Sequence, residues 1–258
     1  MDVMVDAADY PVRVEGRLDA VSRWLWLFKW ILVIPHLIVL FFLWIAFAIL
    51  TVIVFFAILI TARYPEPIFR FNVGVMRWSW RVHFYTYSAL GTDRYPPFTL
   101  ATVDDYPAQF DVAYPERLSR GLVLVKWWLL AIPHFIVLGF FTGAGSYAVR
   151  KDEFYDTWTG NSGEYIFVPV LPGLLYVLVF FVAIVLLFTG GYPRGIFDFV
   201  MGMNRWSWRV GAYVSLMTDH YPPFRIDLGG RDPNQPAPPP APPSSSGDDM
   251  PVAGGGIA

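Results

Sequence analysis

The hexapeptide RWSWRV occupies residues 77–82 and recurs unchanged as residues 205–210. Three other short sequence motifs, called words below, surround both copies in the same order. A K-W pair leading to I-P-H comes before, T-x-x-Y-P lies between, and T-D-x-Y-P-P-F follows. Recurrence of several words in one order predicts an internal duplication, in which each copy forms one structural unit.

The composition around these words is typical of a membrane protein. Hydrophobic residues make up 55% of the 258 residues and charged residues only 16%, which is too apolar for an ordinary soluble domain. The chain has no cysteine, so disulfides, thiolate nucleophiles and cysteine metal sites are excluded. Residues 1–16 contain no apolar run, so we expect no cleavable signal peptide.

The spacing of the matched words locates an insertion. Pro35 matches Pro133, 98 positions later, whereas Tyr64 matches Tyr192, 128 positions later, so the second copy holds thirty additional residues. Aligning the apolar runs places them at 142–171. Because loops and turns tolerate insertions, we expect a turn at the matching point of the first copy, near residues 43–44.

A turn there divides each apolar block into two helices of roughly 30 Å, the thickness of the hydrocarbon core. The predicted spans are 23–43 and 44–62 in the first copy, and 120–141 and 172–190 in the second. An alternative for the first copy is one span at about 37–60, with residues 22–34 lying on the membrane surface.

The charges predict an orientation for the hairpins. Of the 19 Lys and Arg residues, all but Arg150 and Lys151 fall on one side, which the positive-inside rule makes cytoplasmic. Both termini are then expected to be cytoplasmic, and the loop 142–171 to face outward. Two copies with even numbers of spans share one orientation and are related by a pseudo-two-fold axis along the membrane normal.

Segments 68–90 and 196–217, which contain RWSWRV, are too charged to span and too apolar to lie free in water. We therefore expect cytoplasmic interfacial helices. Their arginines share one face and would bind lipid phosphates or acidic groups of a partner, or else Trp and Arg only anchor the helices in the headgroup layer. The candidate binding residues are Arg70, Arg77, Trp78, Trp80, Arg81, Arg205, Trp206, Trp208 and Arg209.

Four further residues are repeated and ionisable. His36 and His134 each follow a proline inside an apolar span, where ionisable groups suggest function. They would relay protons or meet between the copies, or else stay neutral and hydrogen-bonded to a neighbouring helix. Asp93 and Asp219 precede Y-P-P-F, and capping or ion pairing is favoured over catalysis. No metal ligand set or cofactor motif is present.

Short alternating stretches at 11–16, 97–100, 109–114 and 224–228 predict a small extramembrane sheet joining the copies. Residues 1–9 form a leader, followed by copies at 10–100 and 106–228. Residues 229–258, rich in Pro, Gly and Ser, predict a disordered cytoplasmic tail.

The order of the words over about residues 10–228 resembles the DUF4389 family of bacterial membrane proteins, present here in two copies. The resemblance implies a multi-pass protein of the bacterial inner membrane and supplies no catalytic residues. The predicted fold class is an all-α membrane protein of two tandem repeats, each a transmembrane hairpin plus an interfacial helix, with a small β-sheet.

Function follows from where the unusual residues lie. The prediction is a non-enzymatic protein that binds membrane lipids, through anionic headgroups, or a membrane or envelope protein partner, and no nucleic acid. The alternative is a small transporter or channel that uses His36 and His134 at the interface of the repeats. An enzyme acting on lipid is a third hypothesis, suggested only by Asp93 and Asp219 near an arginine-rich surface.

Overall fold

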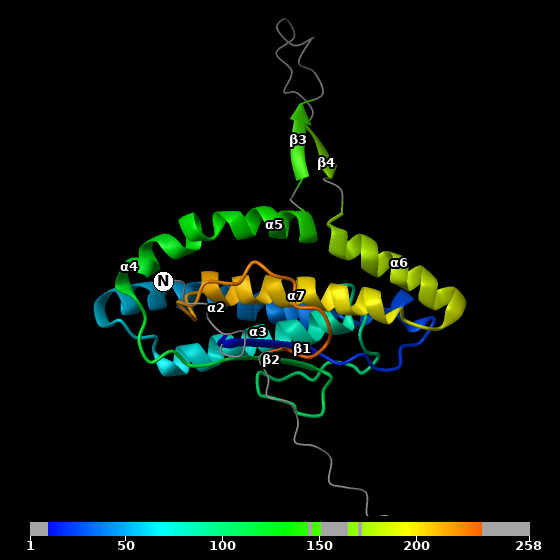
Figure 1. The fold of residues 1–258 in the computed structure, drawn as a ribbon, viewed down its shortest axis with the longest axis horizontal. Helices are drawn as coiled ribbons and strands as arrows, with labels where there is room; N and C mark the ends of the chain where they lie inside the picture. The colour runs from blue at the N-terminus through cyan, green and yellow to red at the C-terminus, as the bar shows by residue number, and fades with distance from the viewer. Residues whose placement is uncertain (1–9, 144–145, 151–164, 170–171, 234–258) are drawn as a thin grey trace, which may run out of the picture.

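The computed structural model describes residues 10–143, 146–150, 165–169 and 172–233 (Figure 1). The predicted leader, the centre of the predicted outer loop and the tail beyond residue 233 lie outside the described residues. The elements in chain order are β1 (Val12–Gly16), η2 (Leu25–Leu27), α1 (Lys29–Leu32), α2 (Ile34–Thr61), α3 (Glu66–Tyr85), β2 (Ala108–Val112), α4 (Arg120–Val125), η3 (Lys126–Leu130), α5 (Ile132–Thr142), β3 (Ser146–Arg150), β4 (Tyr165–Pro169), α6 (Leu174–Thr189) and α7 (Arg194–Val214).

Helix α2 is one continuous helix of 28 residues, about 42 Å long at 1.5 Å per residue. The turn predicted near residues 43–44 is therefore wrong, and so is the two-span hairpin of 23–43 and 44–62. The sequence at this point contains neither Gly nor Pro, so nothing there interrupts the helix. The observed bounds agree better with the alternative of a single helix over about 37–60.

In the second copy, α5 and α6 together correspond to α2. Helices α2 and α5 both begin at I-P-H, and α2 and α6 both end at the Thr of T-x-x-Y-P. Both ends are followed by a left-handed residue, Ala62 with φ 58° and Gly190 with φ 70°. The insertion thus interrupts a helix, which corrects the expectation that it marks a turn.

The described part of the insertion gives the physical reason. Strands β3 and β4 pair antiparallel, and an antiparallel pair brings its outer ends together. The chain can therefore leave the end of α5 and return beside it to begin α6 (Figure 1).

A one-residue difference between the copies is absorbed by a change of helix type. Six positions separate Lys29 from Pro35, but seven separate Lys126 from Pro133. The extra residue falls in η3, which is a π-helix, the form in which an α-helix accommodates one inserted residue. The lysine therefore makes equivalent contacts in both copies, and the proline stays at the start of the helix that follows.

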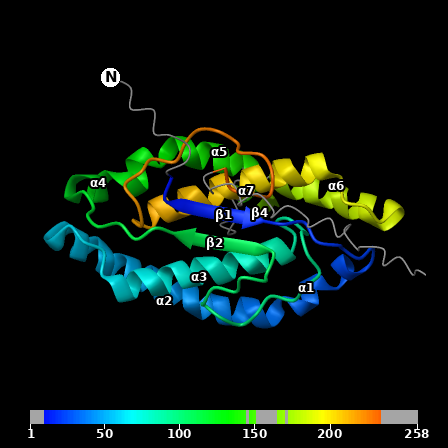
Figure 2. The same cartoon turned by 60° about the horizontal axis from the view of Figure 1, so that its bottom comes forward.

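Helices α3 and α7 are interior helices. Of their tryptophans, Trp80 is 0% exposed, Trp78 5% and Trp206 8%. Figure 2 shows β1 and β2 running between α3 and α7, with α2 and α5/α6 on the outer sides. The expectation of surface helices at 68–90 and 196–217 is corrected: strands and loops cover the arginine face, and apolar helices cover the other.

The strands β1 and β2 join the two copies. They pair antiparallel with Val14 opposite Phe110, which confirms the predicted sheet for the stretches 11–16 and 109–114. The stretches 97–100 and 224–228 are not strands. Strand β1 of the first copy packs against α7 of the second, and strand β2 of the second copy packs against α3 of the first. This exchange interlocks the copies.

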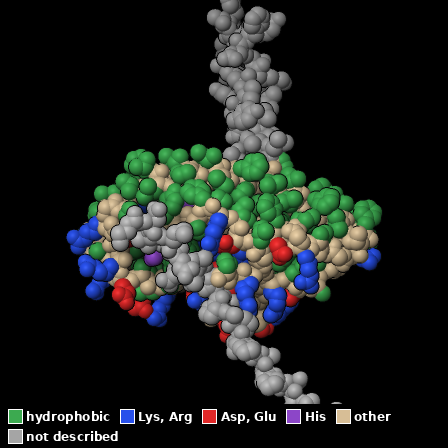
Figure 3. Space-filling view, in the orientation of Figure 1, with side chains coloured by type: hydrophobic (Ala, Val, Ile, Leu, Met, Phe, Trp, Pro, Cys, Tyr) green, Lys and Arg blue, Asp and Glu red, His purple; other side chains and the backbone are tan. Residues whose placement is uncertain are grey.

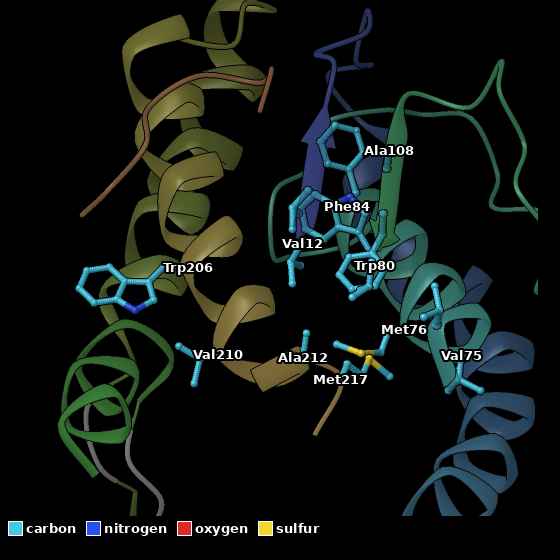
Figure 4. Packing of buried hydrophobic residues seen from close by; sticks show 14 of the residues in the cluster. Val12, Val75, Met76, Trp80, Phe84, Ala108, Trp206, Val210, Ala212 and Met217 are labelled. Atoms are coloured by element: carbon cyan, nitrogen blue, oxygen red, sulfur yellow. The ribbon is translucent and has the colours of Figure 1, made fainter. Parts of the chain in front are cut away.

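The core lies where α3 and α7 meet the sheet. Figure 4 shows Trp80 and Phe84 of α3 beside Val12 and Ala108 of the two strands, and all four side chains are at most 1% exposed. Burying large aromatic side chains stabilises by roughly 1.5–3 kcal/mol each. The exchanged strands are therefore held by the main core of the protein.

The outer surface is divided between an apolar and a charged face. Figure 3 shows hydrophobic side chains over α5 and α6, and charged side chains along the opposite edge. Among the described residues, α2 is long and apolar enough to cross a membrane. The pair 120–130 and α5 passes the same criterion together but is bent by 43°, and α6 is apolar but shorter.

Candidate functional site

The repeated words meet in space and build the same side-chain cluster twice. In the first copy, His36 lies at the start of α2. The indole Nε1–H of Trp78 donates to its Nδ1 at 3.1 Å, and Phe98 stacks on its ring with centroids 3.9 Å apart. Because Nδ1 accepts, the proton of this imidazole is on Nε2 and the ring is neutral. The Nε2 atom has no hydrogen-bond partner among the described residues.

The second copy repeats this geometry around His134. Trp206 Nε1–H donates to His134 Nδ1 at 3.1 Å, Phe224 stacks at 4.3 Å and Tyr221 lies at 4.8 Å. Each histidine is thus enclosed by aromatic residues of its own copy, so the joint histidine site expected at the repeat interface is not formed. The geometry agrees with the alternative of a neutral histidine bonded to a neighbouring helix.

A buried ion pair stands beside each histidine cluster. Lys29 Nζ lies 3.0 Å from Asp93 Oδ1 and donates to the carbonyl of Thr92 at 2.7 Å. Lys126 Nζ lies 2.5 Å from Asp219 Oδ1 and donates to the carbonyl of Thr218 at 2.8 Å.

Both lysines also lie over a tyrosine ring, at 4.6 Å for Tyr85 and 5.1 Å for Tyr213. Each aspartate accepts a second bond from the backbone N–H of a serine, Ser22 or Ser119. These geometries give Asp93 and Asp219 the pairing and capping roles that the sequence favoured over catalysis. Their partner is a lysine instead of an interfacial arginine.

Each of the two clusters connects segments that are distant in the chain. Tyr95 and Tyr221 add hydroxyl bonds to the carbonyls of Leu32 and Leu130, at 3.0 and 3.1 Å, just before each I-P-H proline. The lone pair of each imidazole accepts from a tryptophan N–H, and each lysine is held in an ion pair, so neither is arranged as an activated nucleophile in this geometry. The described residues contain no group of three His, Cys, Asp or Glu side chains able to hold a metal ion.

The arginines of RWSWRV bind the exchanged strands. Arg77 Nε donates to the carbonyl of Phe110 at 3.0 Å, and Arg205 Nε donates to the carbonyl of Val14 at 3.0 Å. Since Val14 and Phe110 face each other in the sheet, the two contacts are reciprocal. Arg77 also pairs with Asp111 at 2.8 Å. At the outer edges of the sheet, the guanidinium groups therefore donate hydrogen bonds to strand carbonyls, as a neighbouring strand would do.

The second arginine of each word is also buried. Arg81 donates to the carbonyl of Ala101 at 2.6 Å, and desolvation by burial lowers its pKa to about 10, so it stays charged at neutral pH. Arg209 instead pairs with Asp227 at 2.5 Å and Asp232 at 3.1 Å. The second copy thus carries carboxylates at a place where the first copy has a backbone carbonyl.

The start of the C-terminal tail is part of this arrangement. Arg205 donates to the carbonyls of Gly229 at 2.8 Å and Arg231 at 3.0 Å, and Asp232 is 0% exposed. The expectation of a disordered tail from residue 229 is therefore wrong for residues 229–232. A buried ion pair holds these residues, which composition alone does not reveal.

The candidate lipid-binding residues are mostly inaccessible. The side chain of Arg70 is 77% exposed and pairs with Glu66 one turn earlier, but that of Arg77 is only 12% exposed. Arg81, Arg205 and Arg209 are at most 2% exposed. Trp208 is partly buried and packs against the core. Apart from Arg70, these side chains pack within the fold.

Two pairs of residues that contribute to these buried contacts were not predicted from the sequence. Lys29 and Lys126 were assigned no pairing role, although the K-W word recurs as faithfully as T-D. Tyr10 and Tyr106 belong to a further repeated word, D-Y-P, at residues 9–11 and 105–107. Arg209 lies 5.2 Å from the Tyr10 ring, and burial raises the pKa of this phenol.

These features define a mostly helical protein of two like copies, with one helix among its described residues able to cross a membrane. The chain belongs to the family named domain of unknown function (DUF4389), whose model matches residues 23–99 and 165–225, more than half of the chain. The two matched segments agree with two tandem copies. No curated protein and no solved structure matches this chain.

Proposed function

We propose that the chain is a non-enzymatic membrane protein whose apolar face is embedded in one leaflet of the bilayer. The observation that carries this proposal is the exposure of large apolar side chains along α2, α5 and α6. Over α5 and α6 they lie on the side away from the charges (Figure 3). Examples are Phe42 at 63%, Ile136 at 71% and Phe188 at 76% exposure. Exposed apolar surface on this scale marks a membrane or partner contact.

The lengths of the helices support embedding over crossing. Helix α5 has 11 residues and α6 has 16, about 17 and 24 Å, so neither alone crosses a core of roughly 30 Å. Helix α2 is long enough, but the helix α3 that packs against it carries charged side chains. The pair of Arg77 and Asp111 sits on its neighbour α3 and strand β2, and Asp111 is 62% exposed.

The four-span arrangement is therefore replaced by a monotopic one, in which the charged face lies on one side of the membrane. Following the excess of basic residues in positive-inside topologies and the family resemblance, we place that face at the cytoplasmic side of a bacterial inner membrane. The His36 and His134 path of a transporter has no supporting observation, because each histidine is enclosed.

Anionic headgroups are the proposed ligands at the rim of the embedded face. Arg120 donates to the carbonyl of Ile60 at the end of α2, at 2.7 Å. Arg23 makes the reciprocal contact with Thr189 at the end of α6, at 3.5 Å. Arg63 and Arg194 are exposed near the same two ends. Each basic side chain near an anionic surface contributes on the order of 1 kcal/mol.

The test is a depth profile along α2, which is possible because the chain has no native cysteine. Ile38, Ile49 and Ile60 are exposed and eleven residues apart, so they share one helix face. Each is replaced by Cys and spin-labelled in reconstituted full-length protein, and depth is measured from oxygen and polar-relaxer accessibility. Asp111→Cys on the charged face is the aqueous control.

An embedded helix gives three similar depths, about 5–10 Å below the headgroups. A spanning helix places position 49 near the centre, about 15 Å deep, and positions 38 and 60 close to the two interfaces. That second profile would refute the monotopic arrangement. Water accessibility at all three positions would refute membrane embedding altogether.

A further inference from the structure

A cavity of about 520 Å³ lies between the two copies. It is bounded by residues of α2, α3, α5, α6 and α7, including Trp44, His83, Phe135, Tyr176 and Ser207. This volume falls within the range of small-molecule sites in proteins, and a mainly apolar wall with few polar groups is typical of them. Neither the repeated clusters nor the rim arginines use it.

The cavity opens on the apolar face. Trp44, Phe135 and Tyr176 line it and are also exposed at the outer surface, by 37%, 46% and 40%. They come from α2, α5 and α6, the three helices that carry the exposed apolar residues. In the arrangement proposed above, the mouth therefore opens to lipid chains.

Two polar side chains of the cavity, His83 and Ser207, offer acceptors. His83 Nδ1 lies 2.7 Å from the carbonyl of Ser79, so Nδ1 carries the proton and Nε2 remains an acceptor on a ring that lines the cavity. His83 is partly accessible to solvent, and the protein packed around the ring lowers its pKa, which favours the neutral form at neutral pH. Ser207 donates its hydroxyl proton to the carbonyl of Met203 at 2.8 Å, leaving its oxygen lone pairs to accept.

The lining also argues against an anionic headgroup. None of the described residues around the cavity is Lys or Arg, so a carboxylate or phosphate would lose its hydration without gaining a counter-charge. A hydroxyl loses less, and its single proton can be donated to His83 Nε2 or to Ser207 Oγ. The chemistry thus selects a neutral, hydroxyl-bearing amphiphile.

We propose that this cavity binds one lipid of the long-chain alcohol class, with its hydroxyl at His83 and its chain leaving between Trp44 and Phe135. The inference rests on the proposed function, because the mouth must face the bilayer. It goes further in assigning a site and a ligand class away from the anionic headgroups of the rim.

Gly211 provides a variant that fills the cavity. A Cβ at this position in α7 would meet only the flexible end of Met76, at 3.5 Å, so Gly211→Leu is accommodated and also improves helix propensity. The matched control is Gly195→Leu in the same helix, where a Cβ meets nothing within 4 Å and the cavity is not touched. A third variant, His83→Leu, removes the acceptor.

The probe is a long-chain alcohol carrying a diazirine in its chain and a terminal alkyne, applied to the full chain in membranes. We expect saturable labelling of peptides from α3, α5 or α7 in the wild type and in Gly195→Leu, and a loss of about tenfold or more in Gly211→Leu. In the wild type, the unlabelled alcohol should compete with the probe better than its methyl ether does. In His83→Leu, the alcohol and the ether should compete equally well.

The inference is overturned by any of three results in protein whose α2 depth profile confirms embedding. These are absence of saturable labelling in the wild type, unchanged labelling in Gly211→Leu, and equal competition by alcohol and ether in the wild type. A fatty acid that displaces the probe better than the alcohol would also overturn the ligand class. Failure of the depth profile, by contrast, refutes the proposed function itself.

Discussion

Replacing Arg205 with leucine should destabilise the protein more than any other single arginine change in RWSWRV. The side chain is 0% exposed and donates to the backbone carbonyls of Val14, Gly229 and Arg231. It also lies 3.5 Å from the buried carboxylate of Asp232. Burial lowers the pKa of Arg205, and the carboxylate of Asp232 is the main charge that opposes this shift. A fourth carbonyl, that of Asp227, also accepts from Arg205, so the variant leaves the carboxylate and four carbonyls without this donor.

Removing one partner of a buried ion pair costs about 3–5 kcal/mol. Arg209 still reaches Asp232 at 3.1 Å, so we expect the lower part of this range. At roughly 2–4 °C per kcal/mol for a protein of this size, the melting temperature should fall by about 6–16 °C. Arg77→Leu should cost less, about 1–3 kcal/mol, because its partner Asp111 is 62% exposed and can be hydrated.

The assay is thermal unfolding of purified full-length protein in one detergent, followed by tryptophan fluorescence. Arg70→Leu is the matched control, because its side chain is 77% exposed and surface ion pairs contribute about 0–1 kcal/mol. The expected order of destabilisation is Arg205, then Arg77, then Arg70. If Arg205→Leu lowers the melting temperature no more than Arg70→Leu, the reading of these arginines as fold-holding groups is refuted.

Three further predictions concern other contacts. Burial raises the pKa of Glu15, so its ionised form is disfavoured by folding and stability should fall as pH rises through the raised value. Glu15→Gln should therefore raise the melting temperature at neutral pH and change it little at acidic pH, and equal effects at both would contradict this origin. His36→Phe leaves the Trp78 indole unpaired and should lower the free energy of unfolding by about 1–3 kcal/mol. A double-mutant cycle with Trp78→Phe that shows no coupling would disprove the hydrogen bond. Deleting Trp128 should convert the π-helix to an α-helix and leave the melting temperature almost unchanged. Deleting Leu32 in the first copy should lower the melting temperature sharply. If both deletions lower it equally, the account of η3 is contradicted.

The sequence predicted the duplication, the helices and the joining sheet because these depend on local patterns. Repeated words identify structural copies without knowledge of contacts. Apolar runs and the positions of Pro and Gly place helix ends, as at Thr61 and Thr189, to within a residue or two of the predicted ends. Alternation at 11–16 and 109–114 predicted two strands that do pair, whereas the same pattern at 97–100 and 224–228 predicted strands that are not formed.

The errors arose where long-range packing decides. The break near residues 43–44 was inferred from an insertion in the other copy, and it failed because a β-hairpin can interrupt a helix and return the chain to the same place. The arginine face of α3 and α7 was predicted to meet headgroups, because no local pattern shows that a strand of the other copy covers it.

The repeated ionisable residues were identified correctly as notable, but their partners could not be assigned. His36 meets Trp78 across 42 positions, and Lys29 meets Asp93 across 64. Spacing alone does not place such residues together. The recurrence of all four words in the same order in both copies was the available signal that they share one site.

The central claim, that α2 lies in the membrane without crossing it, is tested most directly by the sidedness of its two flanks. Ser22→Cys and Arg63→Cys place one exposed thiol before and one after the helix, in a chain that has no other cysteine. A membrane-impermeant maleimide is applied separately to inverted and right-side-out membrane vesicles. The account predicts that both thiols react in inverted vesicles only, and reaction of the two thiols from opposite sides would contradict it.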